Sequence, residues 1–126
     1  MKLIIAGGRD HILTEDEYSL LDELLGDFGI TEVVSGKARG VDTCGEIWAE
    51  LNNIKVEPFL AEWAKYGKSA GNLRNTQMAL YGDALAIFSG GSGSADMLKQ
   101  AKQKDLVIFD FREPEESFED VFGINS

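Results

Sequence analysis

Short apolar runs alternate with amphipathic segments along the chain, and this alternation constrains its fold more than any other feature. The runs cover Lys2–Ala6, Glu32–Ser35 and residues 54–59, 84–88 and 106–111. Helical spacing of apolar residues follows the first four runs, over residues 14–26, Val41–Leu51, 72–81 and 95–104. This order is typical of βαβ units with right-handed crossovers. It predicts an α/β fold, namely a three-layer, doubly wound domain with a mostly parallel five-stranded sheet.

Several residues mark where the predicted elements begin and end. Thr14 and Glu17 form a capping box at the start of the first helix, and Gly26 and Gly29 are expected to end it. Residues 60–71, which include Gly67 and Gly71, are predicted to form a long loop before the third helix.

The length and composition suit one soluble domain. The chain has 126 residues and 44% hydrophobic content, enough for a single packed core. No apolar run reaches the roughly 18 residues of a membrane helix, and the first residues do not form a signal peptide. One cysteine, Cys44, and one histidine, His11, exclude an internal disulfide and argue against a metal site. We expect a cytoplasmic protein with no metal and no cofactor.

The net charge of −10 is unevenly distributed. Residues 110–122 hold six acids and one arginine, which amounts to half of the net charge. We expect a folded domain over residues 1–111 and a solvated acidic tail over residues 112–126, with one amphipathic turn around Phe118 and Phe122. The overall charge argues against general binding of DNA or RNA.

Half of the twelve basic residues fall in the loops that follow the predicted strands. In a doubly wound sheet these loops share one edge, beyond the carboxyl ends of the strands, where such folds bind ligands. An acidic protein that concentrates cations in one crevice is expected to bind a small anion there. The six residues are Arg9, Lys37, Arg39, Lys65, Lys68 and Arg74.

Residues 89–94 read SGGSGS and lie between the fourth strand and a helix. Glycine lets backbone amides approach a ligand closely, and the amino end of a helix attracts phosphate. The same letters are also typical of a flexible linker, but their position favours phosphate binding. The dinucleotide fingerprint G-x-G-x-x-G is absent after the first strand, which argues against an ordinary NAD dehydrogenase.

Residues 67–69 read GKS, like the end of a phosphate-binding P-loop. A P-loop also needs a glycine five positions before the glycine-lysine pair. Glu62 occupies that position and would repel a phosphate. The P-loop interpretation is therefore rejected.

Four further side chains have two interpretations each. Asp42 either caps the second helix or binds a ligand group such as a ribose hydroxyl, and Glu46 lies one turn later on the same face, where it binds ligand or solvent. Arg74 either clamps a phosphate or carboxylate, or forms a surface ion pair. Trp63 either closes over a base or sugar or, as we favour, packs against the third strand.

Taken together, these stretches resemble the SLOG superfamily, the Rossmann-like group that includes the "lonely guy" phosphoribohydrolases and DNA-processing protein A. Within it, the chain is similar to the small prokaryotic and phage branch related to YpsA. The resemblance spans about residues 2–109 and rests on five motifs in the family order. They are AGGRD at residues 6–10, VSGKARGVD at 34–42 with Gly45 and Glu46, AEW at 61–63 followed by YGKSAG at 66–71, LRN at 73–75 with Met78, and FSGGSGS at 88–94.

The resemblance implies a fold that binds nucleotides or nucleotide-derived ligands. Members of the hydrolase branch cleave the N-glycosidic bond of nucleoside monophosphates with a P-G-G-x-G-T-x-x-E motif and an arginine on the preceding helix, to which Arg74 corresponds. This chain has Ser89, Ser94 and Met97 at the proline, threonine and glutamate positions. Asp96 is one residue early, which turns its side chain about 100° around the helix. The phosphate cradle is kept, whereas the family glutamate is absent.

We therefore expect binding of a nucleotide or phosphorylated nucleotide derivative, for sensing or sequestration. The alternative is a phosphoribohydrolase, in which Asp42, Glu46 or Asp96 stabilises an oxocarbenium-like transition state and Arg74 holds the phosphate. Nucleic-acid handling is disfavoured by the charge, and a homodimer is expected because related folds commonly pair through their helices. The predicted ligand-binding residues are Gly7, Gly8, Arg9, Ser35, Gly36, Lys37, Arg39, Gly40, Asp42, Lys68, Arg74, Asn75, Ser89, Gly90, Gly91, Ser92, Gly93 and Ser94, and the predicted catalytic residues are Arg74, Asp42, Glu46 and Asp96.

Overall fold

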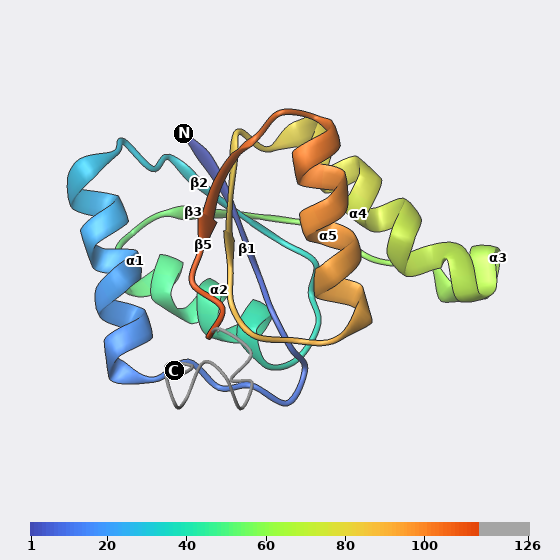
Figure 1. Cartoon of the computed structure of the whole chain (residues 1–126), viewed down its shortest axis with the longest axis horizontal. Helices are drawn as coiled ribbons and strands as arrows, with labels where there is room; N and C mark the ends of the chain where they lie inside the picture. Colours follow the sequence, from blue (N-terminus) through green and yellow to red (C-terminus); the bar gives the residue numbers. More distant parts are fainter. Residues whose placement is uncertain (114–126) are drawn as a thin grey trace, which may run out of the picture.

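The structure, a computed structural model, describes residues 1–113 of the chain. Five strands form one parallel sheet in the order β3-β2-β1-β4-β5 (Figure 1), which confirms the predicted doubly wound fold. The strands are β1 (Lys2–Ala6), β2 (Glu32–Ser35), β3 (Lys55–Pro58), β4 (Ala84–Ile87) and β5 (Val107–Asp110). The helices are α1 (Glu15–Asp27), α2 (Val41–Leu51), α3 (Trp63–Tyr66), the 3-10 helix η1 (Gly67–Ser69), α4 (Ala70–Tyr81) and α5 (Ser92–Gln103). None of these helices is long and apolar enough to cross a membrane.

The two faces of the central strand β1 point into two separate hydrophobic cores. Leu3 and Ile5 pack with α1 and α2, whereas Ile4 and Ala6 pack with α4 and α5. Successive residues of a strand face opposite sides of the sheet, and all four of these side chains are buried. Burial of each large aliphatic side chain contributes roughly 1.5–3 kcal/mol. The sheet is thus held between two helical layers, which fixes the positions of its strand ends.

Helix α1 begins with the predicted capping box. Thr14 Oγ1 accepts the amide of Glu17, and Glu17 Oε1 accepts the amide of Thr14. The helix ends at Asp27, between Gly26 and Gly29, the two glycines predicted to end it. Gly26 is exposed in the last turn, where glycine costs about 0.5–1 kcal/mol relative to alanine but removes no packing contact.

The predicted loop over residues 60–71 is largely helical, because α3, η1 and the start of α4 follow one another across it. Gly67 adopts a φ of 56°, a conformation that favours glycine, and this ends α3. Gly71 lies inside α4, where its cost of about 1 kcal/mol is too small to break the helix. Neither glycine therefore marks a loop.

Helix α5 begins at Ser92, three residues earlier than predicted. Residues 92–94 are therefore the first turn of a helix rather than the end of a loop. The amides of a first turn have no carbonyl partner within their own helix, so they are available to other groups.

The acidic tail begins with a local ion pair. Arg112 donates two hydrogen bonds to Asp110, at 2.9 and 2.6 Å, and these lower the pKa of Asp110. The predicted amphipathic turn around Phe118 and Phe122 lies outside the described residues.

Candidate functional site

The site forms where the strand order reverses, between β1 and β4. The chain leaves these neighbouring strands toward helices on opposite faces of the sheet, which opens a crevice beyond their carboxyl ends. The amide of Gly8 donates to Ser89 O at 2.9 Å, and the amide of Val41 donates to Gly8 O at 3.2 Å. Backbone hydrogen bonds thus join the loops after β1, β2 and β4 at one edge of the sheet.

Two glycines in these loops leave no room for a side chain. Gly40 has a φ of 77°, and a Cβ there would overlap the carbonyl oxygen of Gly8 and lie 2.6 Å from that of Arg9. A Cβ at Gly90 would overlap Ser94 Oγ and lie 2.5 Å from the Gly8 nitrogen. The loops therefore pack backbone against backbone, which brings their amides to the rim of the crevice.

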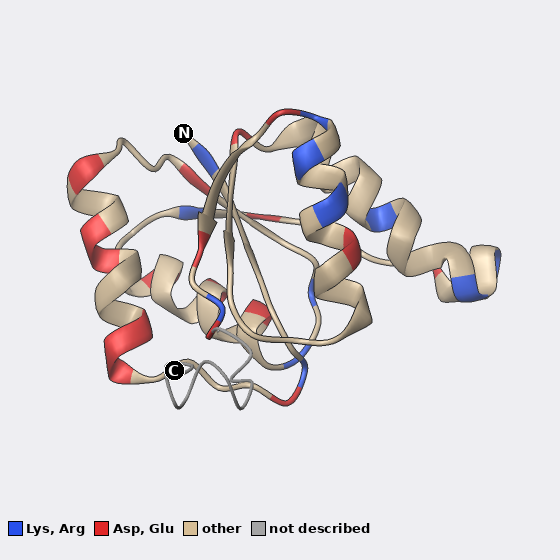
Figure 2. Cartoon of the chain, viewed as in Figure 1, with Lys and Arg blue, Asp and Glu red and all other residues tan. Residues whose placement is uncertain are grey.

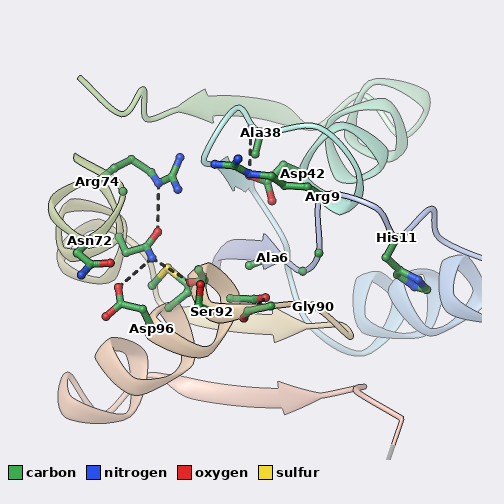
Figure 3. A pocket seen from close by; sticks show the side chains of 18 of the residues that line it. Ala6, Arg9, His11, Ala38, Asp42, Asn72, Arg74, Gly90, Ser92 and Asp96 are labelled. Atoms are coloured by element: carbon green, nitrogen blue, oxygen red, sulfur yellow. Dashed lines mark hydrogen bonds between the residues drawn. The ribbon is translucent and has the colours of Figure 1, made fainter. Parts of the chain in front are cut away.

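A cavity of about 890 Å³ opens at this edge, within the size range of small-molecule sites. Figure 3 shows Arg9, Asp42 and Arg74, from three different elements, around it. The predicted site residues that line it are Gly7, Gly8, Arg9, Asp42, Lys68, Arg74, Asn75, Ser89, Gly90, Gly91, Ser92, Gly93, Ser94 and Asp96.

A second hollow of about 390 Å³ adjoins this cavity. The two share four lining residues, namely Arg9, Ala38, Trp63 and Arg74. Of the remaining predicted site residues, Gly36, Lys37 and Arg39 line only the second hollow, and Ser35, Gly40 and Glu46 line neither.

Several residues that line the cavity are not among the predicted site residues. Asp10, His11 and Asn72 line the cavity. Asn72 lies three residues before Asn75 on α4, and this helical spacing is the signal that places both on one side of the helix. The preference for packing against the third strand is wrong for Trp63, which is 51% exposed and lines both hollows.

The amino end of α5 faces the cavity without a side-chain cap. Its N-cap residue is Gly91, and no side chain of residues 1–113 bonds to its free amides as a cap. The Ser94 hydroxyl instead donates back to Gly91 O at 3.2 Å. Free amides and the helix dipole together give this end a partial positive charge. This end of the helix is therefore suited to binding an anion.

Two hydrogen bonds fix the orientation of the Arg74 guanidinium group, which has five N–H donors in all. Nη1 donates to Gly36 O at 2.6 Å, and Nε donates to Asn75 Oδ1 at 3.1 Å. Nη2 has no hydrogen-bond partner among residues 1–113, so it is available to a ligand. Partial burial lowers the pKa of Arg74, and the nearby charge of Asp42 opposes this shift. An arginine stays protonated at neutral pH, so the cavity contains one oriented, permanent cation.

Asn75 connects Arg74 to the first turn of α5. It is buried, and its Nδ2 donates to Gly93 O at 3.2 Å and to Asp96 Oδ2 at 3.0 Å. Asp96 Oδ2 also accepts Gln100 Nε2 at 3.0 Å. The carboxylate of Asp96 is thus committed to a network that positions α4 against α5.

Asp42 is a buried carboxyl group in the cavity wall, 8% exposed. Its Oδ2 accepts the amide of Ala38 at 3.2 Å, and Gly40 is the N-cap of α2, so the helix-capping interpretation of Asp42 is wrong. Burial raises the pKa of Asp42 from 3.8 to about 6, although the Ala38 amide and the charges of Arg74 and Arg9 act in the opposite direction. Oδ1 has no hydrogen-bond partner among residues 1–113. It can therefore accept a hydrogen bond from a ligand hydroxyl.

Asp42→Asn is expected to stabilise the protein in a pH-dependent way. Because its pKa is higher in the folded than in the unfolded chain, Asp42 contributes less to the free energy of unfolding as the pH rises from about 4 to 6. Asparagine stays neutral and keeps an oxygen for the Ala38 amide, beside the same charges of Arg74, Arg9 and Glu46. The free energy of unfolding from urea titrations should match that of the unmodified protein at pH 4 and exceed it by about 2–3 kcal/mol at pH 8. A difference that is the same at both pH values would contradict this account.

The cations that line only the second hollow are already paired with carboxylates. Lys37 Nζ lies 2.8 Å from Glu46 Oε1, and Arg39 Nη2 lies 3.0 Å from Asp10 Oδ1. Glu46 also accepts the Ser35 hydroxyl at 2.5 Å, so its carboxylate stabilises the loop after β2. Of the six predicted strand-end cations, Arg9, Lys68 and Arg74 line the main cavity, Lys37 and Arg39 are paired as described, and Lys65 lines neither hollow.

The acidic and basic residues are segregated in the fold. Helix α1 carries six acids and no Lys or Arg, whereas α3, η1, α4 and α5 together carry five Lys or Arg and one Asp. Figure 2 shows these two groups of helices on opposite sides of the molecule. The cavity borders the basic group, so its electrostatic surroundings differ from the net charge of the chain.

Comparisons with known proteins agree with this arrangement. The model of a family described as "YspA, cpYpsA-related SLOG family" matches residues 1–66. The Gene 61 protein of Mycobacterium phage D29 is 33% identical over 102 residues, which cover 74% of this chain and 81% of the phage protein. DNA processing protein A (DprA) from Streptococcus pneumoniae has a similar fold, with a TM-score of 0.67 at 16% identity over 96% of this chain. That match covers 53% of DprA, so this chain spans about half of its length.

Proposed function

The chain belongs to the YspA, cpYpsA-related SLOG family, and we propose that it binds a phosphorylated, nucleotide-derived ligand in the cavity beyond β1 and β4. One observation carries the proposal. The uncapped amino end of α5 and the oriented guanidinium of Arg74 line the same cavity. Amides, a helix dipole and an arginine fork are the groups that proteins use for phosphate.

The proposal extends to a sugar because of Asp42. A free phosphate would leave the Oδ1 of this buried carboxyl group unsatisfied, and an unpaired buried acceptor costs about 1–3 kcal/mol. A ribose hydroxyl supplies the missing donor. An ideal Cβ on Gly36 would lie 3.0 Å from both Asp42 Oδ2 and Arg74 Nη1, so the carboxyl group and the cation border one small space. A phosphorylated sugar presents both complementary groups at once.

A thermal-shift panel tests the proposal. The probes are nucleoside monophosphates, cyclic nucleotides and ADP-ribose, with adenosine and inorganic phosphate as controls. A ligand at 100 times its Kd stabilises the folded state by about 2.7 kcal/mol, so at least one phosphorylated probe should raise the Tm by several degrees. Adenosine should have little effect at the same concentration. If every probe leaves the Tm unchanged at millimolar concentration, the proposal is wrong.

A second candidate function is phosphoribohydrolase activity, and the raised pKa of the buried Asp42 favours it. A carboxyl group with a pKa of about 6 beside a sugar is suited to stabilising an oxocarbenium-like transition state or to moving a proton. Met97, at the position of the family glutamate, is 1% exposed and belongs to the hydrophobic core, and Asp96 and Glu46 are held by other side chains. Chromatography of the same incubations for free base tests this activity. Base release that persists unchanged in Asp42→Asn protein would exclude Asp42 as its catalytic residue.

A further inference from the structure

We propose that the second hollow receives the planar ring of the ligand, with the indole of Trp63 as its stacking surface. The inference rests on the proposed function, because it divides one ligand between two adjoining hollows. The phosphate lies at the amino end of α5, and the ring lies beside Trp63.

The indole of Trp63 lies against α4, but about half of the residue is exposed to solvent. It is 51% exposed, and no residue of α3 is buried. Large aromatic side chains stabilise a fold chiefly by burial, so an open indole forgoes much of that contribution. Its Cη2 atom lies 3.4 Å from the point that a Cβ on Gly71 would occupy, so the indole lies against the first turn of α4. One edge of the ring is supported, and much of the rest is available to a ligand.

The second hollow is less suited to the phosphate than the main cavity, because the amino end of α5 lines only the main cavity. Its own cations, Lys37 and Arg39, are paired with Glu46 and Asp10. The rest of its wall includes the apolar side chains Leu60, Ala61, Ala38 and Trp63. A flat, uncharged group gains most from such a surface, because aromatic stacking needs a π face and no counter-charge.

The two hollows are continuous at the residues they share. Arg74 lines both, so a ligand whose phosphate contacts its free Nη2 lies at the boundary between them. Arg9 also lines both and presents a planar guanidinium, which can stack on a ring or contact the phosphate. A nucleoside monophosphate has the required form, with an anion at one end and a planar base at the other.

The test compares ribose 5-phosphate with the nucleoside monophosphate that gives the largest shift in the thermal panel. Calorimetric titration should show that the unmodified protein prefers the nucleotide by about 10-fold or more, because stacking of one base contributes that much. Trp63→Ala should abolish the preference while the affinity for ribose 5-phosphate stays within about threefold, and Trp63→Phe should keep most of it. The matched control is Tyr66→Ala. Tyr66 is an exposed aromatic residue of the same helix that lines neither hollow, so its loss should change neither affinity.

Tryptophan fluorescence gives an independent readout. The second tryptophan, Trp48, is 3% exposed and belongs to the core beneath α1 and α2. The nucleotide should therefore quench Trp63 alone, ribose 5-phosphate should not, and the quenching should vanish in Trp63→Phe.

The possible failures are distinguishable. Binding of both probes with an unchanged nucleotide preference in Trp63→Ala would overturn this inference and leave the proposed function intact. An equal loss of both affinities would also overturn it, because Trp63 would then act on the phosphate site. Binding of neither probe to the unmodified protein would overturn the proposed function and this inference with it.

Discussion

Arg74→Ala is expected to lower the affinity for a nucleoside monophosphate by about 100-fold, equivalent to about 2.7 kcal/mol. The guanidinium group is the oriented permanent cation of the cavity, and hydrogen bonds between charged groups contribute about 1.5–3 kcal/mol each. Two of its donors are already held by Gly36 and Asn75, so the ligand meets a group whose orientation is fixed before binding. Calorimetric titration of the purified variant measures the loss directly.

Two further variants separate charge from geometry. Arg74→Lys keeps the positive charge but loses the planar fork, so it should recover only part of the affinity. Lys99→Ala removes a positive charge from an exposed position of α5 that does not line the cavity, and it should bind like the unmodified protein. If Arg74→Ala folds, as judged by its thermal melt, and still binds within threefold of the unmodified protein, the phosphate site has been misplaced.

Gly40→Ala is expected to destabilise the fold by about 4 kcal/mol or more. A non-glycine residue at a φ of 77° costs of order 1–3 kcal/mol, and the new Cβ would also overlap the Gly8 carbonyl oxygen. Because the Gly8 carbonyl belongs to the backbone, it cannot rotate away as a side chain can. The loops after β1 and β2 would have to move apart to make room for the Cβ. A domain of this size has a total stability of about 5–15 kcal/mol, so the variant should be mostly unfolded or close to it at 37 °C.

Gly26→Ala is the matched control for this experiment. A Cβ on Gly26 would meet nothing within 4 Å, and the residue lies inside α1. Alanine should therefore raise the free energy of unfolding by about 0.5–1 kcal/mol. Urea titrations of both variants give the comparison. If Gly40→Ala unfolds at the same urea concentration as the unmodified protein, the loops are not packed as described.

The framework of the fold is readable from the sequence because its signals are local. Strands β1 and β2 coincide with the predicted Lys2–Ala6 and Glu32–Ser35, since each is a compact apolar run between clear boundaries. Parallel strands place their carboxyl ends together, so the meeting of the loops after β1, β2 and β4 also follows from the order of elements. The homodimer, the cytoplasmic location and the domain boundary at residue 111 stay predictions.

The details of the site depend on contacts between distant residues. Lys37 pairs with Glu46 and Arg39 pairs with Asp10, and no local pattern in the sequence indicates these ion pairs among the cations expected at the anion site. The raised pKa of Asp42 comes from burial, which depends on the packing of the whole domain. Trp63 is exposed because it lies on α3, a short helix with no buried residue. This helix falls in the segment predicted to be a loop.

Amide chemical shifts test the central claim most directly. A ¹⁵N-labelled sample is titrated with the best nucleoside monophosphate and, in parallel, with its nucleoside. The account predicts saturable shifts in the amides of residues 90–94 and 7–9 with the monophosphate, and much smaller shifts there with the nucleoside. Shifts confined to other parts of the sheet, or equal shifts with and without the phosphate, would contradict it.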